Sequence, residues 1–350
     1  MKFRLKQLPA AALAAAAALA LAACGAGGAA PEGSAAPAAT ENADLTVYNA
    51  QHETMTKAWV DAFTAETGIT VSVRKGKDTE MSNQIIAEGE ASPADVFITE
   101  NSPAMTQVEN AGLFTEVSET VQENVPEEFR PSSNMWTGVA ARSTVFVYNK
   151  DKVKEADLPK SIMDLADPKW AGKWGAAPGG ADFQAIVSAM LELEGEQATS
   201  DWLKAMKENV KVYPGNGAAM KAVNAGEVDG AVIYHYYYAA DQAGTGENSG
   251  NVAPHYFKNE DPGAFLSVSG GGVLKSSKNP EAAMQFLEFI TSKQGQELLG
   301  TGVDFEYPVG KDVTPREGLV PIPELEAPKV DASKLNSQKV VELMTDAGLL

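Results

Sequence analysis

Residues 44–73 read DLTVYNAQHETMTKAWVDAFTAETGITVSV, and this stretch decides which class of fold the chain adopts. Its central part carries Met55, Trp59 and Phe63 at four-residue spacing, so their side chains share one face of a helix. Gly68 follows the last of them and ends the helix. The pattern therefore predicts a helix with one apolar face.

Strand-forming residues flank this helix on both sides. DLTVYN at 44–49 precedes it and ITVSV at 69–73 follows it, which makes a βαβ unit with parallel strands. The alternation continues along the chain. Further strands are expected at 95–99, 144–148, 230–234 and 272–274, and further helices at 81–90, 183–195, 200–210, 220–228, 279–299 and 337–350. The sequence therefore predicts an α/β fold in which helices flank a sheet.

Residues 1–23 are interpreted as an export signal. A basic start precedes an alanine-rich run at 9–23, which is shorter and less apolar than the roughly 20 residues of a membrane-spanning helix, the alternative. LAAC at 21–24 resembles the bacterial lipobox, so Cys24, the sole cysteine, is predicted to be lipidated. Residues 24–43 have the small, flexible composition of a tether. We expect export, with Cys24 anchoring the chain to the outer face of the cytoplasmic membrane.

The charge of the chain excludes one class of partner. Removing Lys2, Arg4 and Lys6 with the export signal leaves 25 Lys and Arg against 47 Asp and Glu, a net charge of −22. Nucleic acid is excluded as a partner, because phosphate binding requires a positive surface. We expect most of this acidity to be solvated surface.

Polar side chains follow three of the predicted strands. The first strand runs into His52, the third into Glu100, and the strand at 230–234 into the cluster YHYYY at 234–238. Ligands of open α/β sheets bind beyond the carboxyl ends of the strands. An imidazole, a carboxylate and two or more phenols are therefore expected in one cleft.

These donors favour a trivalent iron ion over other metals. Fe(III) is a hard cation that prefers anionic oxygen, which phenolate and carboxylate supply, and it tolerates imidazole. Softer metals prefer thiolates or several histidines, and the chain has one cysteine and three histidines. The pKa of a phenol in water is about 10, and only a highly charged cation keeps it ionised at neutral pH. We therefore expect Fe(III) as the cargo.

Two glycine-containing segments precede predicted helices and are candidate anion sites. Gly179 and Gly180 precede the helix at 183–195, and Gly-Asn-Gly at 215–217 precedes the helix at 220–228. Backbone N–H groups and the positive end of the helix dipole attract anions at such positions. Either segment alone is weak evidence, because glycine before a helix is usually turn chemistry. Beside a cation site, they predict an anion that completes the coordination of the iron.

Five segments resemble the bacterial ferric-ion-binding proteins, the iron-carrying solute receptors of ABC importers. They are YNAQHE (48–53), SPADVFITE (92–100), VIYHYYYAA (232–240), DPGAFLSVSGGGVLKSS (261–277) and EYPV (306–309). The similarity covers nearly all of the chain from Asp44 to Leu350. ADVF and the adjacent tyrosine pair are its most specific elements.

The resemblance implies a set of iron ligands. The histidine motif of the family falls on His52, and its glutamate, which follows the ADVF strand, falls on Glu100. Its adjacent tyrosine pair falls on Tyr236 and Tyr237. The expected iron site therefore consists of one imidazole, one carboxylate and two phenolates.

The resemblance also implies a synergistic anion, which would be phosphate, carbonate or citrate. The small-residue loop of the family matches Gly179, Gly180 and Ala181, and its asparagine matches Asn216. The family usually presents Thr-Ser-Gly-Ala in this loop, whereas this chain has no hydroxyl there. The difference leaves the identity of the anion open.

Three more residues are candidates for a position behind the ligands. Arg142 matches a family arginine near the cleft, and a surface salt bridge is the alternative. Tyr234 and His235 stand where the family often has asparagines. Either could replace a contact to the cargo or pack behind the iron ligands.

The fold implied is the two-lobe, type 2 periplasmic-binding-protein or venus-flytrap fold, with mixed sheets. The first lobe is expected at 44–143 with a return segment at 268–318, and the second at 144–267 with a C-terminal segment at 319–350. Iron binding would close the cleft by hinge motion. We therefore expect a monomeric receptor, not an enzyme, that captures ferric ion or a small ferric complex and delivers it to an ABC permease.

Two alternatives stay open. The same fold could carry an organic cation or anion, such as a polyamine, thiamine or a phosphonate, since stacked aromatic rings suit organic cations. An exported metallohydrolase is the other alternative, because His52-Glu53 begins like the zinc motif H-E-x-x-H. Thr56 stands where that motif needs its second histidine, so the motif is incomplete.

Overall fold

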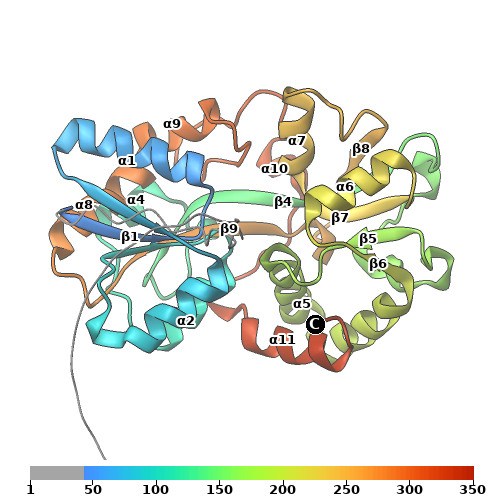
Figure 1. Cartoon of the computed structure of the whole chain (residues 1–350), viewed down its shortest axis with the longest axis horizontal. Helices are drawn as coiled ribbons and strands as arrows, with labels where there is room; N and C mark the ends of the chain where they lie inside the picture. Colours follow the sequence, from blue (N-terminus) through green and yellow to red (C-terminus); the bar gives the residue numbers. More distant parts are fainter. Residues whose placement is uncertain (1–42) are drawn as a thin grey trace, which may run out of the picture. The chain divides into compact units, whose positions relative to one another are not determined.

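The computed structural model describes residues 43–350 (Figure 1). The export signal, Cys24 and nearly all of the predicted tether lie outside these residues. In the part of the chain that the structure describes, every helix is too short or too polar to span a membrane. The described residues belong to one compact unit.

One mixed sheet forms the frame of the described chain. Its strands are β1 (Leu45–Asn49), β2 (Val71–Lys75), β3 (Val96–Ile98), β4 (Thr137–Asn149), β5 (Trp174–Ala176), β6 (Val210–Val212), β7 (Gly230–Tyr234), β8 (Val252–His255) and β9 (Leu266–Val273). Their order is β2-β1-β3-β9-β4-β7-β5-β6, and β8 pairs with β4. β1 pairs in parallel with β2 and with β3, which confirms the predicted βαβ unit.

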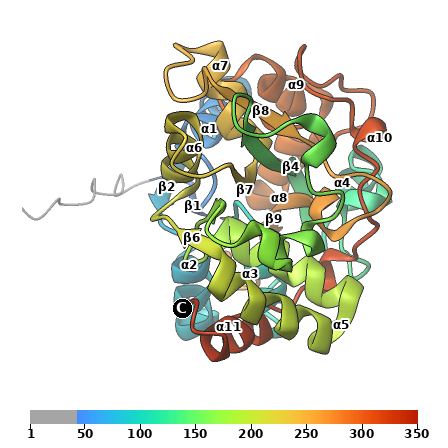
Figure 2. The same cartoon turned by 90° about the vertical axis from the view of Figure 1, so that its right-hand side faces the viewer.

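Helices lie on both sides of these strands (Figure 1, Figure 2). They are α1 (Glu53–Thr67), α2 (Asp78–Glu88), α3 (Ser102–Asn110), α4 (Glu119–Asn124), α5 (Ala181–Asn209), α6 (Asn216–Ala225), α7 (His235–Ala243), α8 (Pro280–Thr291), α9 (Lys293–Thr301), α10 (Ile322–Leu325) and α11 (Ser337–Asp346). Short 3₁₀ turns occur between them. The predicted α/β class is confirmed.

The alternation of side chains along β1 explains how one sheet supports two cores. Val47 belongs to the same buried cluster as Trp59 and Phe63 of α1. Its neighbour Tyr48 belongs to a different cluster, which contains Met81 of α2. Successive side chains of a strand point to opposite faces, so β1 attaches α1 on one face and α2 on the other. Burying a side chain of this kind is worth roughly 1.5–3 kcal/mol, which fixes both helices.

The long antiparallel pair β4 and β9 joins the two parallel parts of the sheet. β9 pairs with β3 on its other side, and β4 pairs with β7. The sequence predicted only the second half of β4 and the end of β9. The lobe boundaries proposed along this pair stay a prediction.

The glycine run 270–272 is the reason why most of β9 was missed. Glycine is normally depleted in strands. Here a Cβ at Gly270 would lie 2.2 Å from a side-chain atom of Met105, and one at Gly272 would lie 2.7 Å from Phe114. The run therefore permits close packing of β9 against its neighbours.

One helix prediction needs correction. The helix expected at 279–299 is two helices, because the Ser292 hydroxyl accepts a hydrogen bond from the N–H of Gly295 and starts α9. The two helices expected between 183 and 210 are confirmed, and both lie within the range labelled α5. Gly195, whose φ of 80° lies in the left-handed region, separates them at a kink.

Candidate metal site

His52 lies at the junction of β1 and α1 and makes no side-chain capping bond to the helix. Its Nε2 lies 3.3 Å from Oε1 of Glu100. Its Nδ1 lies 3.5 Å from Asp304 and 3.4 Å from Glu306. The imidazole therefore stands between carboxylates on both of its nitrogen atoms.

Glu100 follows β3 and connects His52 to the tyrosine pair. Its Oε1 accepts a hydrogen bond of 2.9 Å from the phenol of Tyr236. Tyr236 and Tyr237 belong to the first turn of α7, and their rings stack with centroids 4.4 Å apart. The ring of His52 lies 5.0 Å from that of Tyr236. The structure thus brings the four predicted ligands together; their binding of a metal stays a prediction.

A carboxylate that was not predicted from the sequence lies beside both phenols. Asp182 belongs to the first turn of α5, and its Oδ2 lies 3.4 Å from the phenol oxygen of Tyr236 and 3.5 Å from that of Tyr237. The same oxygen accepts a 2.7 Å hydrogen bond from the Nδ2 of Asn216. A signal was present in the sequence, since Asp182 directly follows the segment 179–181 that was predicted to hold an anion.

One residue predicted to bind an anion, Asn216, therefore contacts a carboxylate of the chain itself. Gly180 is the N-cap of α5 and Asn216 is the first residue of α6. Asn101 adds a further amide donor, because its Nδ2 lies 3.0 Å from Oδ1 of Asp182. Both oxygens of Asp182 are thus held by amide groups, which fixes the orientation of the carboxylate.

Tyr234 and His235 are fully buried behind this cluster. The phenol of Tyr234 donates to Oδ1 of Asn101 at 3.3 Å. The Nδ1 of His235 accepts a 3.1 Å hydrogen bond from the N–H of Ser143. Its Nε2 lies 2.9 Å from the carbonyl oxygen of Phe305, and because a carbonyl only accepts, this nitrogen carries the proton. Both side chains fasten the segment that carries the tyrosine pair.

Arg142 is buried and forms an ion pair with Glu306, with 2.6 Å between Nη2 and Oε1. Neither side chain has solvent exposure, so the surface salt bridge suggested for Arg142 is wrong. Its guanidinium carbon lies 5.8 Å from the ring centroid of Tyr234 and 5.9 Å from that of Tyr236. A cation at this distance is attracted to the face of an aromatic ring. Arg142 therefore places a fixed positive charge behind the phenols.

The comparison with known proteins identifies the family. Residues 91–330 match the model of the bacterial extracellular solute-binding proteins. The chain belongs to this family. The solute-binding protein is 59% identical over 315 residues to the Fe(3+)-binding periplasmic protein of Serratia marcescens, which covers 90% of this chain and 93% of the relative.

Solved structures resemble this solute-binding protein over most of its length. Iron-bound HitA from Pseudomonas aeruginosa has a TM-score of 0.81 at 40% identity, and the match covers 87% of this chain and 99% of that chain. IdiA (FutA) from Trichodesmium, solved with iron and citrate ligands, has a TM-score of 0.75 at 27% identity with the same coverage. The predicted type 2 periplasmic-binding-protein fold and the membership of the ferric-ion-binding proteins are confirmed.

The carboxylates around the imidazole shift its pKa. Burial lowers the pKa of His52, but hydrogen bonds to Asp304 and Glu100 outweigh it and raise this pKa to about 10. Burial alone would raise the pKa of Glu100. Its hydrogen bond to His52 and the charge of Arg142 outweigh burial and lower this pKa to about 2. In the iron-free solute-binding protein these two groups therefore form a charged pair.

The pKa shifts of the phenols and of Asp182 favour the neutral form of each group. Burial and then the charge of Glu100 raise the pKa of Asp182 to about 7. Burial and the charge of Asp182 raise the pKa of Tyr237 to about 12 and that of Tyr236 further. Without a cation the phenols stay protonated at neutral pH. A highly charged cation is what would ionise them.

The donor set of this cluster depends on the phenols. Within residues 43–350, no group of three or more His, Cys, Asp and Glu side chains is arranged to hold a metal by itself.

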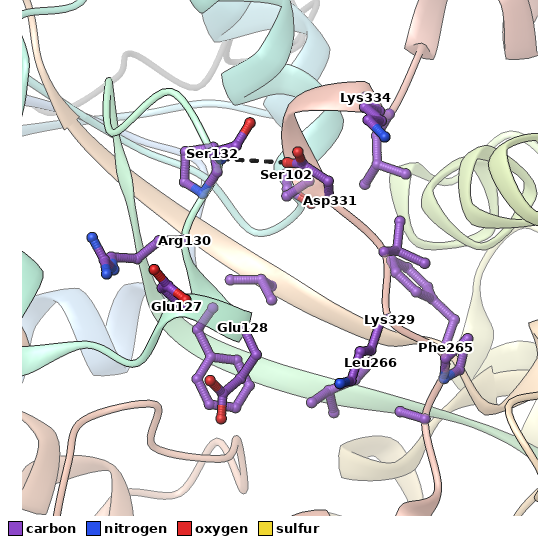
Figure 3. A pocket seen from close by; sticks show the side chains of 18 of the residues that line it. Ser102, Glu127, Glu128, Arg130, Ser132, Phe265, Leu266, Lys329, Asp331 and Lys334 are labelled. Carbon is purple, nitrogen blue, oxygen red and sulfur yellow. Dashed lines mark hydrogen bonds between the residues drawn. The ribbon is translucent and has the colours of Figure 1, made fainter.

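A cavity of about 1080 Å³ lies apart from the candidate ligands (Figure 3). It lies beside β9 and the segment 322–335, and Ser132 donates its backbone N–H to Asp331 within it. Its charged lining residues include Glu127, Glu128, Arg130, Lys329 and Lys334. The mixture of both signs favours no class of ligand.

Proposed function

We propose that this solute-binding protein captures Fe(III) outside the cytoplasmic membrane and delivers it to an ABC permease. The observation that carries the proposal is the meeting of His52, Glu100, Tyr236 and Tyr237. Consecutive contacts of 3.3 and 2.9 Å link the imidazole, the carboxylate and the first phenol, whose ring stacks on the second. The ferric-ion-binding names of its relatives support the same cargo.

The chemistry of these side chains favours a hard trivalent ion. Anionic oxygen donors dominate the cluster, and such donors prefer cations of high charge. A trivalent ion supplies the energy that is needed to ionise buried phenols, which a divalent ion rarely does. An organic cation such as thiamine or a polyamine is the weaker candidate, because it gains nothing from an imidazole.

Asp182 changes the expectation of a synergistic anion. Its carboxylate accepts a hydrogen bond from Asn216 and directly follows Gly179, Gly180 and Ala181 in the sequence, the residues at which phosphate, carbonate or citrate was expected. We propose that Asp182 is a further iron ligand and fills a position that the external anion would fill. Two carboxylates and two phenolates then carry four negative charges against the three positive charges of the ion, so a bound external anion is not needed for neutrality.

The remaining parts of the proposal concern location and partners. The relatives named in the comparisons are solute-binding proteins, and we propose that this chain also acts by binding and not by catalysis. Export and lipidation at Cys24 would hold the monomer at the outer face of the cytoplasmic membrane, near the permease.

A titration of the purified apo-protein with ferric citrate tests the cargo and the ligands together. Wild-type protein should develop a visible phenolate-to-iron absorption band. Tyr236→Phe and Tyr237→Phe each remove a proposed iron ligand. Each should weaken ferric binding by at least roughly 10–100-fold, which is the usual cost of losing a hydrogen-bond partner of a metal ligand. Tyr238→Phe is the matched control, because Tyr238 belongs to the same helix turn and burial is the cause of its raised pKa, whereas the charge of Asp182 contributes to the raised pKa of Tyr236 and Tyr237.

Two results would refute the proposal. If both phenylalanine variants keep the affinity and colour of the wild type, the site lies elsewhere. If the protein binds an organic cation and shows no ferric band, the weaker candidate is correct.

A further inference from the structure

The two ring nitrogens of His52 face different groups. Nε2 faces Glu100 and the phenols, whereas Nδ1 faces Asp304 and Glu306. If Nε2 binds iron, Nδ1 must carry the imidazole proton. This proton needs a hydrogen-bond acceptor, and the acceptor also sets the orientation of the imidazole ring. Nδ1 is buried and makes no hydrogen bond in this structure, and Asp304 and Glu306 are the carboxylates near it. One of the two carboxylates therefore determines how the imidazole presents itself.

Asp304 is the less constrained of these two carboxylates. Its side chain keeps 15% of its exposure and accepts a 2.6 Å hydrogen bond from Thr54 near the protein surface. Solvent can therefore compete for its oxygens.

Glu306 is fully buried, and three donors hold it. Its Oε1 accepts from Arg142 at 2.6 Å, and the same oxygen is the one that faces Nδ1 of His52. Its Oε2 lies 3.4 Å from Nε2 of Gln51 and 3.5 Å from the hydroxyl of Ser269. Arg142 belongs to β4 and Ser269 to β9, so the carboxylate is anchored to the strands that join the two parts of the sheet.

The backbone beside Glu306 also touches the segment that carries the phenols. The carbonyl of Phe305 accepts from Nε2 of His235, the residue directly before Tyr236. Phe305 has a φ of 56°, a left-handed conformation that costs a non-glycine residue energy and persists only where surrounding contacts hold it. The segment 304–306 thus contacts His52 with its side chains and α7 with its backbone.

We propose that Glu306 is a positioning residue for iron capture: it accepts the Nδ1 proton of His52, aims Nε2 at the metal, and is held in place by Arg142. This inference rests on the proposed ferric site. Glu306 acts through the imidazole and does not touch the cargo.

Glu306→Gln is the informative variant because it keeps the size of the side chain. Both oxygens of Glu306 face donors, so the amide nitrogen opposes a donor in either orientation, Arg142 and His52 on one side or Gln51 on the other. The variant should bind Fe(III) roughly 10–100-fold more weakly, the usual cost of losing an outer partner of a ligand. Asp304→Asn is the comparison and should cause a smaller loss.

A double-mutant cycle separates positioning from a general structural effect. Ferric affinity is measured for wild type, Glu306→Gln, His52→Ala and the double variant. If Glu306 acts through the imidazole, Glu306→Gln costs little once His52 is alanine. An equal cost in both backgrounds overturns the proposal, as does a larger loss from Asp304→Asn than from Glu306→Gln.

Nitrogen NMR of histidine-labelled wild-type protein loaded with gallium(III), a diamagnetic substitute for Fe(III), tests the tautomer without any variant. His235 and His255 both donate from Nε2 to carbonyl oxygens, so they provide internal references of the opposite tautomer. His52 should carry its proton on Nδ1 and show a metal-shifted Nε2. A proton on Nε2, or a metal-shifted Nδ1, overturns the proposal. Absence of any metal binding by the wild type would instead refute the ferric site itself.

Discussion

At the scale of single residues, Asp182 is subject to opposing influences. The first turn of α5 favours its charged form, because the positive end of the helix dipole lies there. Burial and the charge of Glu100 oppose ionisation and raise its pKa. A trivalent cation between the carboxylates removes that repulsion. Asp182 is therefore suited to keep a proton in the iron-free protein and to lose it when iron binds.

Replacing Asp182 with alanine should make iron capture depend on an external anion. The variant loses a carboxylate beside both phenols, so ferric affinity should fall and partly recover when phosphate or carbonate is added. Wild-type affinity should respond little to either anion. Asp201→Ala, an exposed carboxylate on the same helix, is the control. Titrations with and without added anion would contradict this expectation if the wild type and Asp182→Ala respond alike.

Some residues of this cluster can be predicted from the sequence and others cannot. His52 and Glu100 could be placed because each follows a strand, and the carboxyl ends of parallel strands meet at one edge of the sheet. Asp182 is not predicted from the sequence, because the glycine segment before it indicates an anion bound by backbone N–H groups and not a carboxylate of the chain. Glu306 and Arg142 form an ion pair although they lie 164 residues apart in the sequence, and a local sequence pattern cannot predict such a contact.

At the scale of elements, β9 combines a packing role with a positioning role. The hydroxyl of Ser267 in this strand donates to Asn101, and that of Ser269 donates to Glu306, both beside the site. The glycines that follow let the strand approach its neighbours closely. Helix periodicity is local and could be predicted, whereas the length of β9 depends on partners distant in sequence and could not. The strand therefore became recognisable only once its neighbours were in place.

Gly270→Ala should destabilise the protein by about 1–3 kcal/mol, the usual cost of overpacking a core. The new methyl group would lie 2.2 Å from Cγ of Met105 and 3.1 Å from Trp136, both fully buried. Gly217→Ala is the matched control, since its Cβ meets nothing within 4 Å and it lies in α6, where alanine is favoured. Denaturant unfolding should show a loss only for the first variant; equal midpoints for both would contradict the packing argument.

At the scale of the whole molecule, the shifted groups link stability to pH. Asp182 has a folded pKa of about 7 against an ordinary value of 3.8, and His52 one of about 10 against 6.5. Both raised values mean that the iron-free folded protein binds more protons than the unfolded chain. Their contribution is complete below the ordinary pKa and is lost as pH rises through the folded pKa. Glu100, with a lowered pKa of about 2, instead loses its contribution in acid.

We therefore expect the iron-free protein to lose stability as pH rises from about 7 to about 10, where His52 titrates, and iron to stabilise it more as pH rises. Below about pH 7 the buried His235, whose pKa burial lowers to about 3, opposes the effect of Asp182. One pKa unit corresponds to about 1.4 kcal/mol, so the change due to His52 is a few kcal/mol. Iron reverses the trend because it displaces protons from Asp182, the imidazole and the phenols, and protons compete less at higher pH.

Thermal unfolding across this range, with and without ferric citrate, should give midpoints that diverge with pH. Measured down to about pH 4, Asp182→Asn should lack the loss of stability that Asp182 contributes below about pH 7, and it should keep the slope due to His52 above that pH. Iron-free midpoints that rise with pH over the same range would show that these carboxylates and this imidazole do not share the buried cluster from which the binding site is built.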